Sequence, residues 1–228
     1  MRTELTWLGH ACWQLRTAER TILIDPFLDE SPTAPVRAAD IEADVILVTH
    51  GHFDHIADAA PIAKRTGATV IANFEIAQWL TNVHGVTATV GMNLGGSYDL
   101  GGAKVTMVPA WHSSQLPDGS YGGNPGGFIL QLSGKRLYFA GDTALFSDMQ
   151  LFARGGLDLA VLPIGDLFTM GIEDSIRAIR WLAPKQVAPS HYGTWPPIAV
   201  DAGQWAEAVR RETSAEPIVV EPGGKFLV

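Results

Sequence analysis

The segment "HGHFDH", residues 50–55, places three of the chain's seven histidines beside an aspartate. In an extended segment, His50 and His52 point the same way because they are two residues apart, so they can hold one ion together. Asp54 and His55 are adjacent where a helix is expected to begin. They therefore point in different directions and can reach a second ion. The segment predicts a metal centre built from imidazole and carboxylate groups.

Other polar residues that could bind a metal follow apolar runs elsewhere in the chain. Asp25 ends "TILID", His112 follows "VTMVPAW", Asp142 follows "RLYFAG", Asp166 follows "DLAVLPIG" and His191 follows "QVAPS". Side chains just past the ends of strands converge when those strands stop at one edge of a sandwich. We therefore expect distant segments to share one site.

The donor set limits the chemistry of such a site. Imidazole and carboxylate without thiolate suit zinc, manganese or iron. We expect two divalent metal ions as cofactors, Zn²⁺ first, with Mn²⁺ or iron as alternatives, and a bridging anion that Asp142 in "FAGDT" can provide. Two such ions lower the pKa of water and polarise the scissile group, so water becomes the nucleophile. Cys12, the single cysteine, lies in an apolar run and is expected in the core.

Composition narrows the class of protein. Hydrophobic residues make up 46% of the 228 residues and charged residues 18%, which indicates a globular chain, and no linker or repeat divides it. We expect one domain over 1–228. The net charge of −8 disfavours a broad phosphate-binding surface, so nucleic acid is an unlikely partner. No run approaches the ~18 apolar residues of a membrane span, and the N-terminus lacks a signal core, so we predict no membrane association and a cytoplasmic location.

The elements that must position these residues are short strands alternating with fewer helices. Apolar runs bounded by turn residues predict strands in "ELTWLGH", "CWQLRT", "TILIDPF", "DVILVTH", "TVIAN", "KVTMVPAWH", "GFILQLS", "RLYFAGD", "DLAVLPIGD", "QVAPSHYG" and "PIVVEPGGKFLV". Helices are predicted over 58–66, with Asp58 as N-cap, and over 74–81, 148–154, 172–183 and 201–212. Helices in both halves indicate an α/β fold of two sheets packed face to face with helices outside, a four-layer αββα sandwich. The irregular stretch 113–127 predicts a functional loop.

The polar motifs resemble a known family. "THGHFDH", His112 in "PAWHSS", Asp142 in "AGDT" and His191 in "SHYG" resemble, in order, the successive motifs of the metallo-β-lactamase superfamily. Asp25 in "LIDPF" resembles the aspartate that precedes them, and the match runs from residue 2 to about 220. Within the superfamily, "WLGHACWQL", "LIDPFL", "GGNPGGFIL" and "LPIGDLFTMG" are similar to small metal-dependent hydrolases of the ascorbate-6-phosphate-lactonase-like group.

This resemblance implies a role for each matching residue. It places His50, His52 and His112 on one metal, Asp54, His55 and His191 on the other, and Asp142 between the two. Asp25 would stand behind the ligands and orient an imidazole or satisfy the "HGHFDH" loop. The flavodiiron branch resembles the same pattern but usually carries Glu at the position of His52, so His52 favours hydrolysis over redox chemistry.

Several polar and aromatic residues keep two interpretations each. Asp54 and His10 are the candidates for proton transfer, although His10 in "GHAC" could instead hydrogen-bond the backbone at a bend. Asn124 and Asp166 are pocket or loop-ordering groups, or else ordinary turn residues, and Trp111 and Trp195 form apolar walls for a substrate or belong to the core.

The combined prediction is a dinuclear hydrolase that acts on a small-molecule ester, lactone or phosphoester through metal-activated water. The alternatives are a nucleic-acid phosphodiesterase of the same superfamily and a non-catalytic metal-binding protein. The resembled nucleases grip RNA through an inserted arm or an extra domain, and 228 residues with a net charge of −8 leave little room for either. The full ligand set disfavours the second alternative. Because oligomers are common in the resembled group, a homo-oligomer stays open.

Overall fold

The computed structural model describes residues 3–228, in which fourteen strands form two seven-stranded sheets. The first sheet has the order β14-β1-β2-β3-β4-β5-β6 and the second has the order β13-β12-β11-β10-β9-β8-β7. The strands of the first sheet are β1 Glu4–Trp7, β2 Trp13–Arg16, β3 Thr21–Ile24, β4 Val45–Leu47, β5 Thr69–Asn73, β6 Thr89–Met92 and β14 Lys225–Leu227. Those of the second are β7 Ser97–Asp99, β8 Ala103–Pro109, β9 Gly126–Leu132, β10 Lys135–Phe139, β11 Leu159–Pro163, β12 Gln186–Ser190 and β13 Glu216–Pro217.

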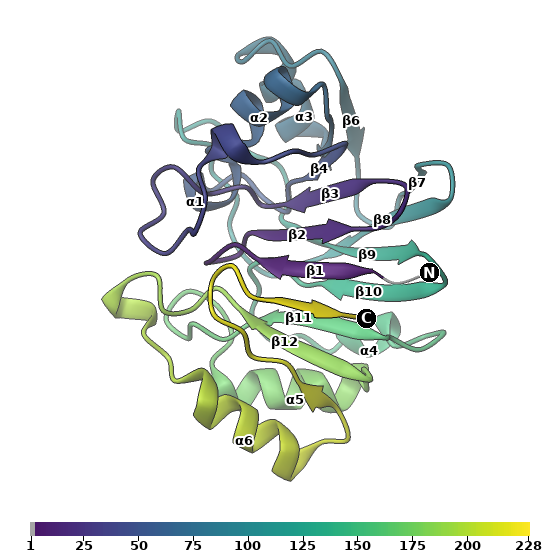
Figure 1. The fold of residues 1–228 in the computed structure, drawn as a ribbon, viewed down its shortest axis with the longest axis vertical. Helices are drawn as coiled ribbons and strands as arrows, with labels where there is room; N and C mark the ends of the chain where they lie inside the picture. Colours follow the sequence, from purple (N-terminus) through teal and green to yellow (C-terminus); the bar gives the residue numbers. More distant parts are fainter. Residues whose placement is uncertain (1–2) are drawn as a thin grey trace.

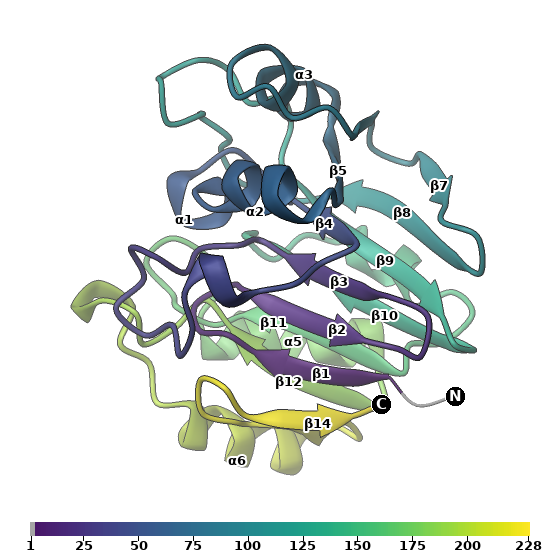
Figure 2. The same cartoon turned by 45° about the horizontal axis from the view of Figure 1, so that its top comes forward.

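Helices cover the outer face of each sheet. α1 Phe53–Ile56, α2 Ala59–Thr66 and α3 Phe74–Asn82 lie on the first sheet, and α4 Met149–Phe152, α5 Ile172–Leu182 and α6 Ala202–Glu212 lie on the second. Figure 1 and Figure 2 show the helices on opposite sides of the paired sheets. Two short 3₁₀ turns, Ala38–Asp40 and Pro196–Ile198, complete the elements. The predicted four-layer αββα sandwich is confirmed.

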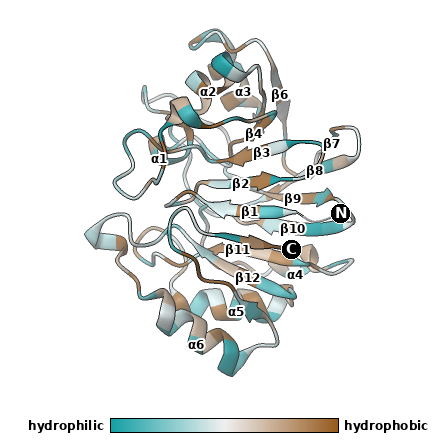
Figure 3. Cartoon of the chain, in the orientation of Figure 1, coloured by the Kyte–Doolittle hydropathy of each residue, from teal (hydrophilic) through white to brown (hydrophobic). Residues whose placement is uncertain are grey.

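The two sheets bury a shared apolar core between them. Leu5, Trp13 and Ile22 from the first sheet belong to one buried cluster with Phe128 and Val161 from the second. Every residue of β4 and β11 is buried, because a sheet lies on one face of these strands and helices on the other. In Figure 3 these interior strands are largely brown, whereas α5 and α6 carry both brown and teal residues. The core therefore holds the strand ends in fixed positions.

Strand direction places the polar segments at one edge. β3, β4, β5 and β6 run parallel, as do β10, β11, β12 and β13. The carboxyl ends of parallel neighbours meet at the same edge of a sheet. In Figure 1 this edge lies to the left, where α1 is drawn, and the C-terminus lies to the right. The segments after β3, β4, β10 and β12 consequently come together at the left edge.

The helix predictions are close in position, and Asp58 is the N-cap residue of α2 as predicted, but its side chain does not cap the helix. Asp58 directly precedes α2, yet its carboxylate accepts no hydrogen bond from that helix. Its Oδ2 accepts instead from the backbone N–H groups of Leu28, at 2.6 Å, and Asp29, at 3.1 Å. Asp58 therefore ties the segment after β3 to the start of α2. The helix predicted over 148–154 is shorter than expected and ends at Phe152.

The strand predictions missed two strands and merged two others. β6 and β7 lie at the sheet edges and carry few fully buried residues, so the apolar pattern that marks a strand is weak there. "PIVVEPGGKFLV" is not one strand, because a turn containing Gly223, with φ of +89°, separates β13 from β14. Cys12 is buried, as predicted. Within residues 3–228, no helix is long and apolar enough to cross a membrane.

Candidate metal centre

The structure brings the predicted ligand residues to the left edge of the two sheets. Asp25 and His191 directly follow β3 and β12, and His50, His112 and Asp142 lie shortly after β4, β8 and β10. Asp54 and His55 lie in the single turn of α1. Strands of both sheets therefore contribute to one cluster of imidazole and carboxylate groups.

Donor atoms of the cluster fall into three overlapping groups, each within 4.8 Å. The first contains His50, His52 and His112, which the resemblance assigns to one metal. The second contains Asp54, His55 and His191, assigned to the other metal, and adds His10. The third contains His50, His55 and Asp142.

Asp142 joins the first two groups. Its Oδ2 lies 3.0 Å from Nε2 of His191 and 3.4 Å from Nε2 of His55, and it lies 3.6 Å from Nε2 of His112 and 4.0 Å from Nε2 of His50. The carboxylate is buried, and its Oδ1 has no hydrogen-bond partner among the described residues. Oδ2 of Asp142 therefore lies close to imidazole nitrogens from both predicted ligand groups.

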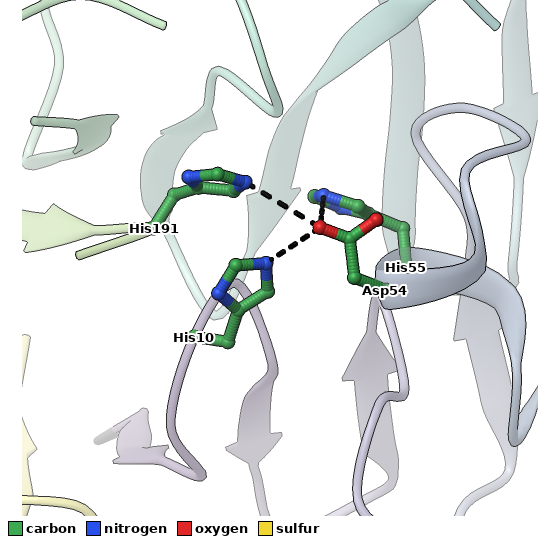
Figure 4. A group of neighbouring side chains, drawn as sticks. All are labelled: His10, Asp54, His55 and His191. Atoms are coloured by element: carbon green, nitrogen blue, oxygen red, sulfur yellow. Dashed lines mark hydrogen bonds and ion pairs between the residues drawn. The ribbon is translucent and has the colours of Figure 1, made fainter. Parts of the chain in front are cut away.

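His10 points its ring at the carboxylate of Asp54 (Figure 4). It is fully buried and is not among the residues that line the pocket described below. Asp54 Oδ2 is 3.0 Å from Nε2 of His10, 3.7 Å from Nε2 of His191 and 3.8 Å from Nε2 of His55. A carboxylate only accepts, so His10 donates Nε2–H, and its Nδ1 accepts from the hydroxyl of Thr194 at 2.7 Å. His10 therefore holds Asp54 in position.

Asp25 and Thr49 orient two of the imidazoles from the opposite side. Asp25 accepts from the backbone N–H of Thr49 at 2.8 Å, from its hydroxyl at 2.7 Å and from Nδ1 of His55 at 2.9 Å. Because the Thr49 hydroxyl donates to Asp25, it accepts from Nδ1 of His50 at 3.0 Å. The Nε2 atoms of His50 and His55 are thereby the ones left to face an ion.

Replacing Thr49 by Val is expected to weaken metal binding about 10- to 100-fold, the usual effect of losing a partner that orients a ligand. Valine keeps the volume of threonine but removes the hydroxyl that fixes the ring of His50. Titration against a competing chelator measures this change, and Thr49→Ser should restore binding. Thr106→Val in β8, which removes a hydroxyl hydrogen-bonded to that of Ser97 in β7, is the matched control. Equal metal affinity in the Thr49→Val and wild-type proteins would contradict this role.

The electrostatics keep one set of imidazoles neutral. Burial lowers the pKa of His50, His52 and His112, and neighbouring imidazoles lower it further. Burial also lowers the pKa of His10 to about 4, although its hydrogen bond to Asp54 acts in the opposite direction. Neutral imidazole is the form that binds metals.

The carboxylates of Asp54 and Asp142 stay ionised, and they favour the charged forms of His55 and His191. Burial acts to raise the pKa of Asp142, but attraction to His191 and His55 outweighs it and holds the pKa well below its usual range. Burial acts to lower the pKa of His191, but Asp142 raises it to about 9. A cation that binds at such a site must displace these protons.

Backbone strain is concentrated at this edge. Among residues 3–228, non-glycine residues with positive φ include His10 at 51°, Asp25 at 46°, His191 at 52° and Asp166 at 69°. This conformation is costly for L-residues and persists where the surrounding contacts enforce it. The carbonyl of His10 accepts from the backbone N–H of His191 at 3.0 Å and the hydroxyl of Ser190 at 3.2 Å, which locks two of these turns together.

A pocket of about 500 Å³ opens onto the cluster. Polar groups that line it include His52, Asp54, His112, Asp142 and His191, and the remaining lining is mainly apolar. This volume suits a small molecule.

The structure decides between the interpretations left open above. Trp195 lines the pocket. Trp111 is neither a pocket wall nor a core residue, because its side chain is exposed and stacks on Phe146 outside the pocket. Asn124 lines an adjoining hollow in the 113–127 loop. Asp166 lies outside the pocket lining, and its backbone N–H donates to the carbonyl of Met170, so it orders its own loop.

Thr49, Thr194 and Ser113 are contacts that the sequence analysis missed. The hydroxyl of Ser113 lies 3.2 Å from Nε2 of His52. Thr49 and Ser113 directly adjoin His50 and His112 in the chain, which is the signal that could have identified them. Thr194 carries no such signal, because it meets His10 across the whole length of the chain.

The donors present fit divalent cations. Imidazole nitrogens and carboxylate oxygens converge without a Lys or Arg among them, and Nε2 of His55 and Oδ1 of Asp142 are buried without hydrogen-bond partners in the described part of the chain. Buried polar atoms are normally satisfied, so these atoms indicate a ligand.

Comparisons with known proteins agree with the fold and the cluster. The β-lactamase superfamily domain matches residues 20–192. A UPF0173 metal-dependent hydrolase of Thermus thermophilus is 49% identical over 220 residues, and the alignment covers 96% of each chain. One of Thermococcus onnurineus is 45% identical over 223 residues, covering 96% of this chain and 97% of that protein.

A solved structure shares the whole architecture. Igni18, described as a novel metallo hydrolase from Ignicoccus hospitalis, superposes with a TM-score of 0.90 and 34% identity, covering 100% of this chain and 99% of that one. The fold, the cluster and these matches define a metal-dependent hydrolase of the metallo-β-lactamase superfamily. The chain belongs to the UPF0173 family of metal-dependent hydrolases within that superfamily.

Proposed function

We propose that the protein is a dinuclear hydrolase that acts on a small-molecule ester, lactone or phosphoester. The metal ligands in this proposal are His50, His52 and His112 for one ion and Asp54, His55 and His191 for the other, with Asp142 shared and Asp25 behind them. The observation that carries it is the position of Asp142 Oδ2, within 4.0 Å of imidazole nitrogens from both ligand groups. A shared carboxylate is typical of two-metal sites.

The mechanism divides the work between ions and side chains. When bound, divalent ions lower the pKa of water and polarise the oxygen of the scissile group. Asp54 lines the pocket and can take or return a proton there, as a general base or acid. His10 restrains Asp54 through its Nε2–H, and the Thr194 hydroxyl restrains His10 in turn. His10 therefore affects proton transfer through the position of Asp54.

The pocket supports a small substrate. Its volume of about 500 Å³ lies within the range of small-molecule sites. Phe53 and Trp195 form apolar walls beside the proposed ligands. No separate nucleophilic side chain is required, since Cys12 is buried in the core and far from ionisation because burial raises the pKa of its thiol.

Metal analysis of protein purified without chelators tests the proposal directly. We expect two divalent ions per chain. The protein reconstituted with Zn²⁺, Mn²⁺ or Fe²⁺ is then assayed with lactones, phosphodiesters and thioesters. Turnover that requires the metal supports the hydrolase. Protein that holds two ions and turns over no substrate class would instead support a non-catalytic metal-binding role.

A further inference from the structure

We infer that the substrate is an uncharged ester or lactone carrying an apolar group, an inference that rests on the proposed hydrolase function. Beyond the ligand cluster, the pocket is walled by Phe53, Phe168, Trp195, Pro197 and Ile198. Phe53 is 50% exposed and Phe168 is 55% exposed, so both rings present apolar area to whatever enters. Large apolar side chains left open beside a reactive centre are typical of a site that binds an apolar group.

One wall of the pocket is held in place before any ligand arrives. Phe27 is 1% exposed and packs beneath the wall, with its ring centroid 5.7 Å from that of Phe53 and 5.9 Å from that of Trp195. The rings of Phe53 and Trp195 are themselves 6.1 Å apart. A preformed apolar wall loses little conformational freedom on binding, so the area it buries adds directly to affinity.

Among the described residues, the pocket itself presents no cationic side chain that could receive an anionic substrate, and Arg37, which lies nearby, is paired with Asp29 at 3.3 Å. The segments that build the left edge of the molecule also contain no Lys or Arg. They are residues 7–15, 25–36, 48–58, 109–130, 140–153, 163–176 and 188–209.

The exposed charges on these segments are instead acidic. Asp29, Glu30, Asp118, Asp148 and Asp166 are all exposed there, and of these Asp29 is paired with Arg37. The proposed ions would attract the reacting group of either substrate class. A further anionic oxygen of a phosphoester, however, would find no Arg or Lys in the pocket lining to hold it, and acidic side chains around it. An ester or lactone carbonyl carries no net charge and needs only polarisation at one oxygen. The charge distribution therefore favours the carboxylic esters and lactones within the proposed range over the phosphoesters.

A series of substrates with one leaving group tests this choice. We would compare 4-nitrophenyl acetate, butyrate and hexanoate with bis(4-nitrophenyl) phosphate, using the metal-loaded enzyme. Each added methylene that is buried should raise kcat/KM by about fourfold, and hexanoate should exceed the phosphodiester. A preference for the phosphodiester would overturn the inference and leave the hydrolase intact. Metal-dependent turnover of none of these compounds would overturn both.

Variants of Phe168 connect the preference to the pocket. Phe168→Ala should lower kcat/KM for the hexanoate more than for the acetate, because the longer chain loses more contact. Phe168→Lys should shift the ratio of activities toward bis(4-nitrophenyl) phosphate. Val83→Ala is the control, since Val83 is 60% exposed at the end of α3 and outside the pocket. An unchanged hexanoate-to-acetate ratio in Phe168→Ala would contradict the assignment.

Binding without turnover gives an independent measurement. In saturation-transfer NMR, irradiation of aromatic protein protons should transfer magnetisation to the alkyl chain of hexanamide, an uncharged compound that the enzyme is not expected to hydrolyse at a useful rate. Phe168→Ala should weaken the transfer and Val83→Ala should not. Absence of transfer to hexanamide in the wild-type protein would show that the pocket does not hold an alkyl chain and would overturn the inference.

Discussion

The His52→Ala variant is expected to lose metal and hydrolytic activity while it keeps its fold. His52 Nδ1 lies 3.0 Å from Nε2 of His50, and the ring belongs to the donor group of His50 and His112. Its side chain is only partly buried, so its loss leaves no large internal cavity. We expect at least one ion fewer per chain and a fall in kcat/KM of at least about 10²-fold, because even partners that merely orient a ligand contribute about 10- to 100-fold.

Histidine 84 offers a matched control for this experiment. His84 is also partly buried, and it packs on Trp79 at a ring-centroid distance of 4.2 Å, outside every donor group. His84→Ala should retain both ions and full activity. Metal content comes from elemental analysis and the fold from circular dichroism. A His52→Ala protein that keeps two ions and wild-type turnover would remove His52 from the ligand set.

The general position of the cluster could be predicted because it depends on local signals. Asp25, His50 and His191 each follow an apolar run that forms a strand. The direction of that strand decides at which edge of the sheet the residue lies. Parallel neighbours in an α/β sandwich leave few choices of edge, so the convergence of these segments follows from the strand pattern. The spacing of the polar residues within 50–55 similarly follows from the short segment after β4, whose side chains must all point to the same edge of the sheet.

The contacts that orient these side chains could not be predicted in the same way. Thr194 meets His10 only because the turns after β1 and β12 adopt left-handed backbone conformations. A sequence pattern predicts such conformations at glycine, and here they occur at His10 and His191. Asp58 shows the same limit, since its carboxylate prefers two backbone N–H groups after β3 to the helix that it precedes.

The charge distribution of the pocket edge illustrates a signal that becomes informative only in the folded chain. The Lys and Arg residues are scattered through the sequence, and the net charge of −8 says nothing about their positions. Folding brings the cation-free segments to one edge, whereas Arg20 and Arg136 lie in the β2–β3 and β9–β10 regions on the opposite side. The net charge disfavoured a nucleic-acid partner, whereas the positions of the charges in the folded chain favour an uncharged substrate.

The Asp25→Asn variant is expected to bind metal about 10- to 100-fold more weakly than the wild type. Asparagine retains the size of aspartate and tolerates the left-handed backbone at φ of 46°. Its amide, however, presents N–H groups where Asp25 Oδ2 now accepts from Thr49 and His55. To avoid two donors facing each other, neutral His55 must carry its proton on Nε2, the atom that the proposal assigns to an ion. The metal-free protein should also lose about 1–3 kcal/mol of its free energy of unfolding.

Three measurements separate this mechanism from general destabilisation. Competition with a chelator gives the metal affinity, urea unfolding of the metal-free protein gives the stability, and ¹⁵N NMR of the imidazoles reports which nitrogen of His55 carries the proton. Asp44→Asn is the control, because Asp44 is exposed and its carboxylate accepts from the backbone N–H of Thr21 at the opposite end of β3. If Asp25→Asn left the metal affinity unchanged, Asp25 would serve only the "HGHFDH" loop. If affinity fell without a change in the His55 tautomer, the loss would arise from the missing negative charge.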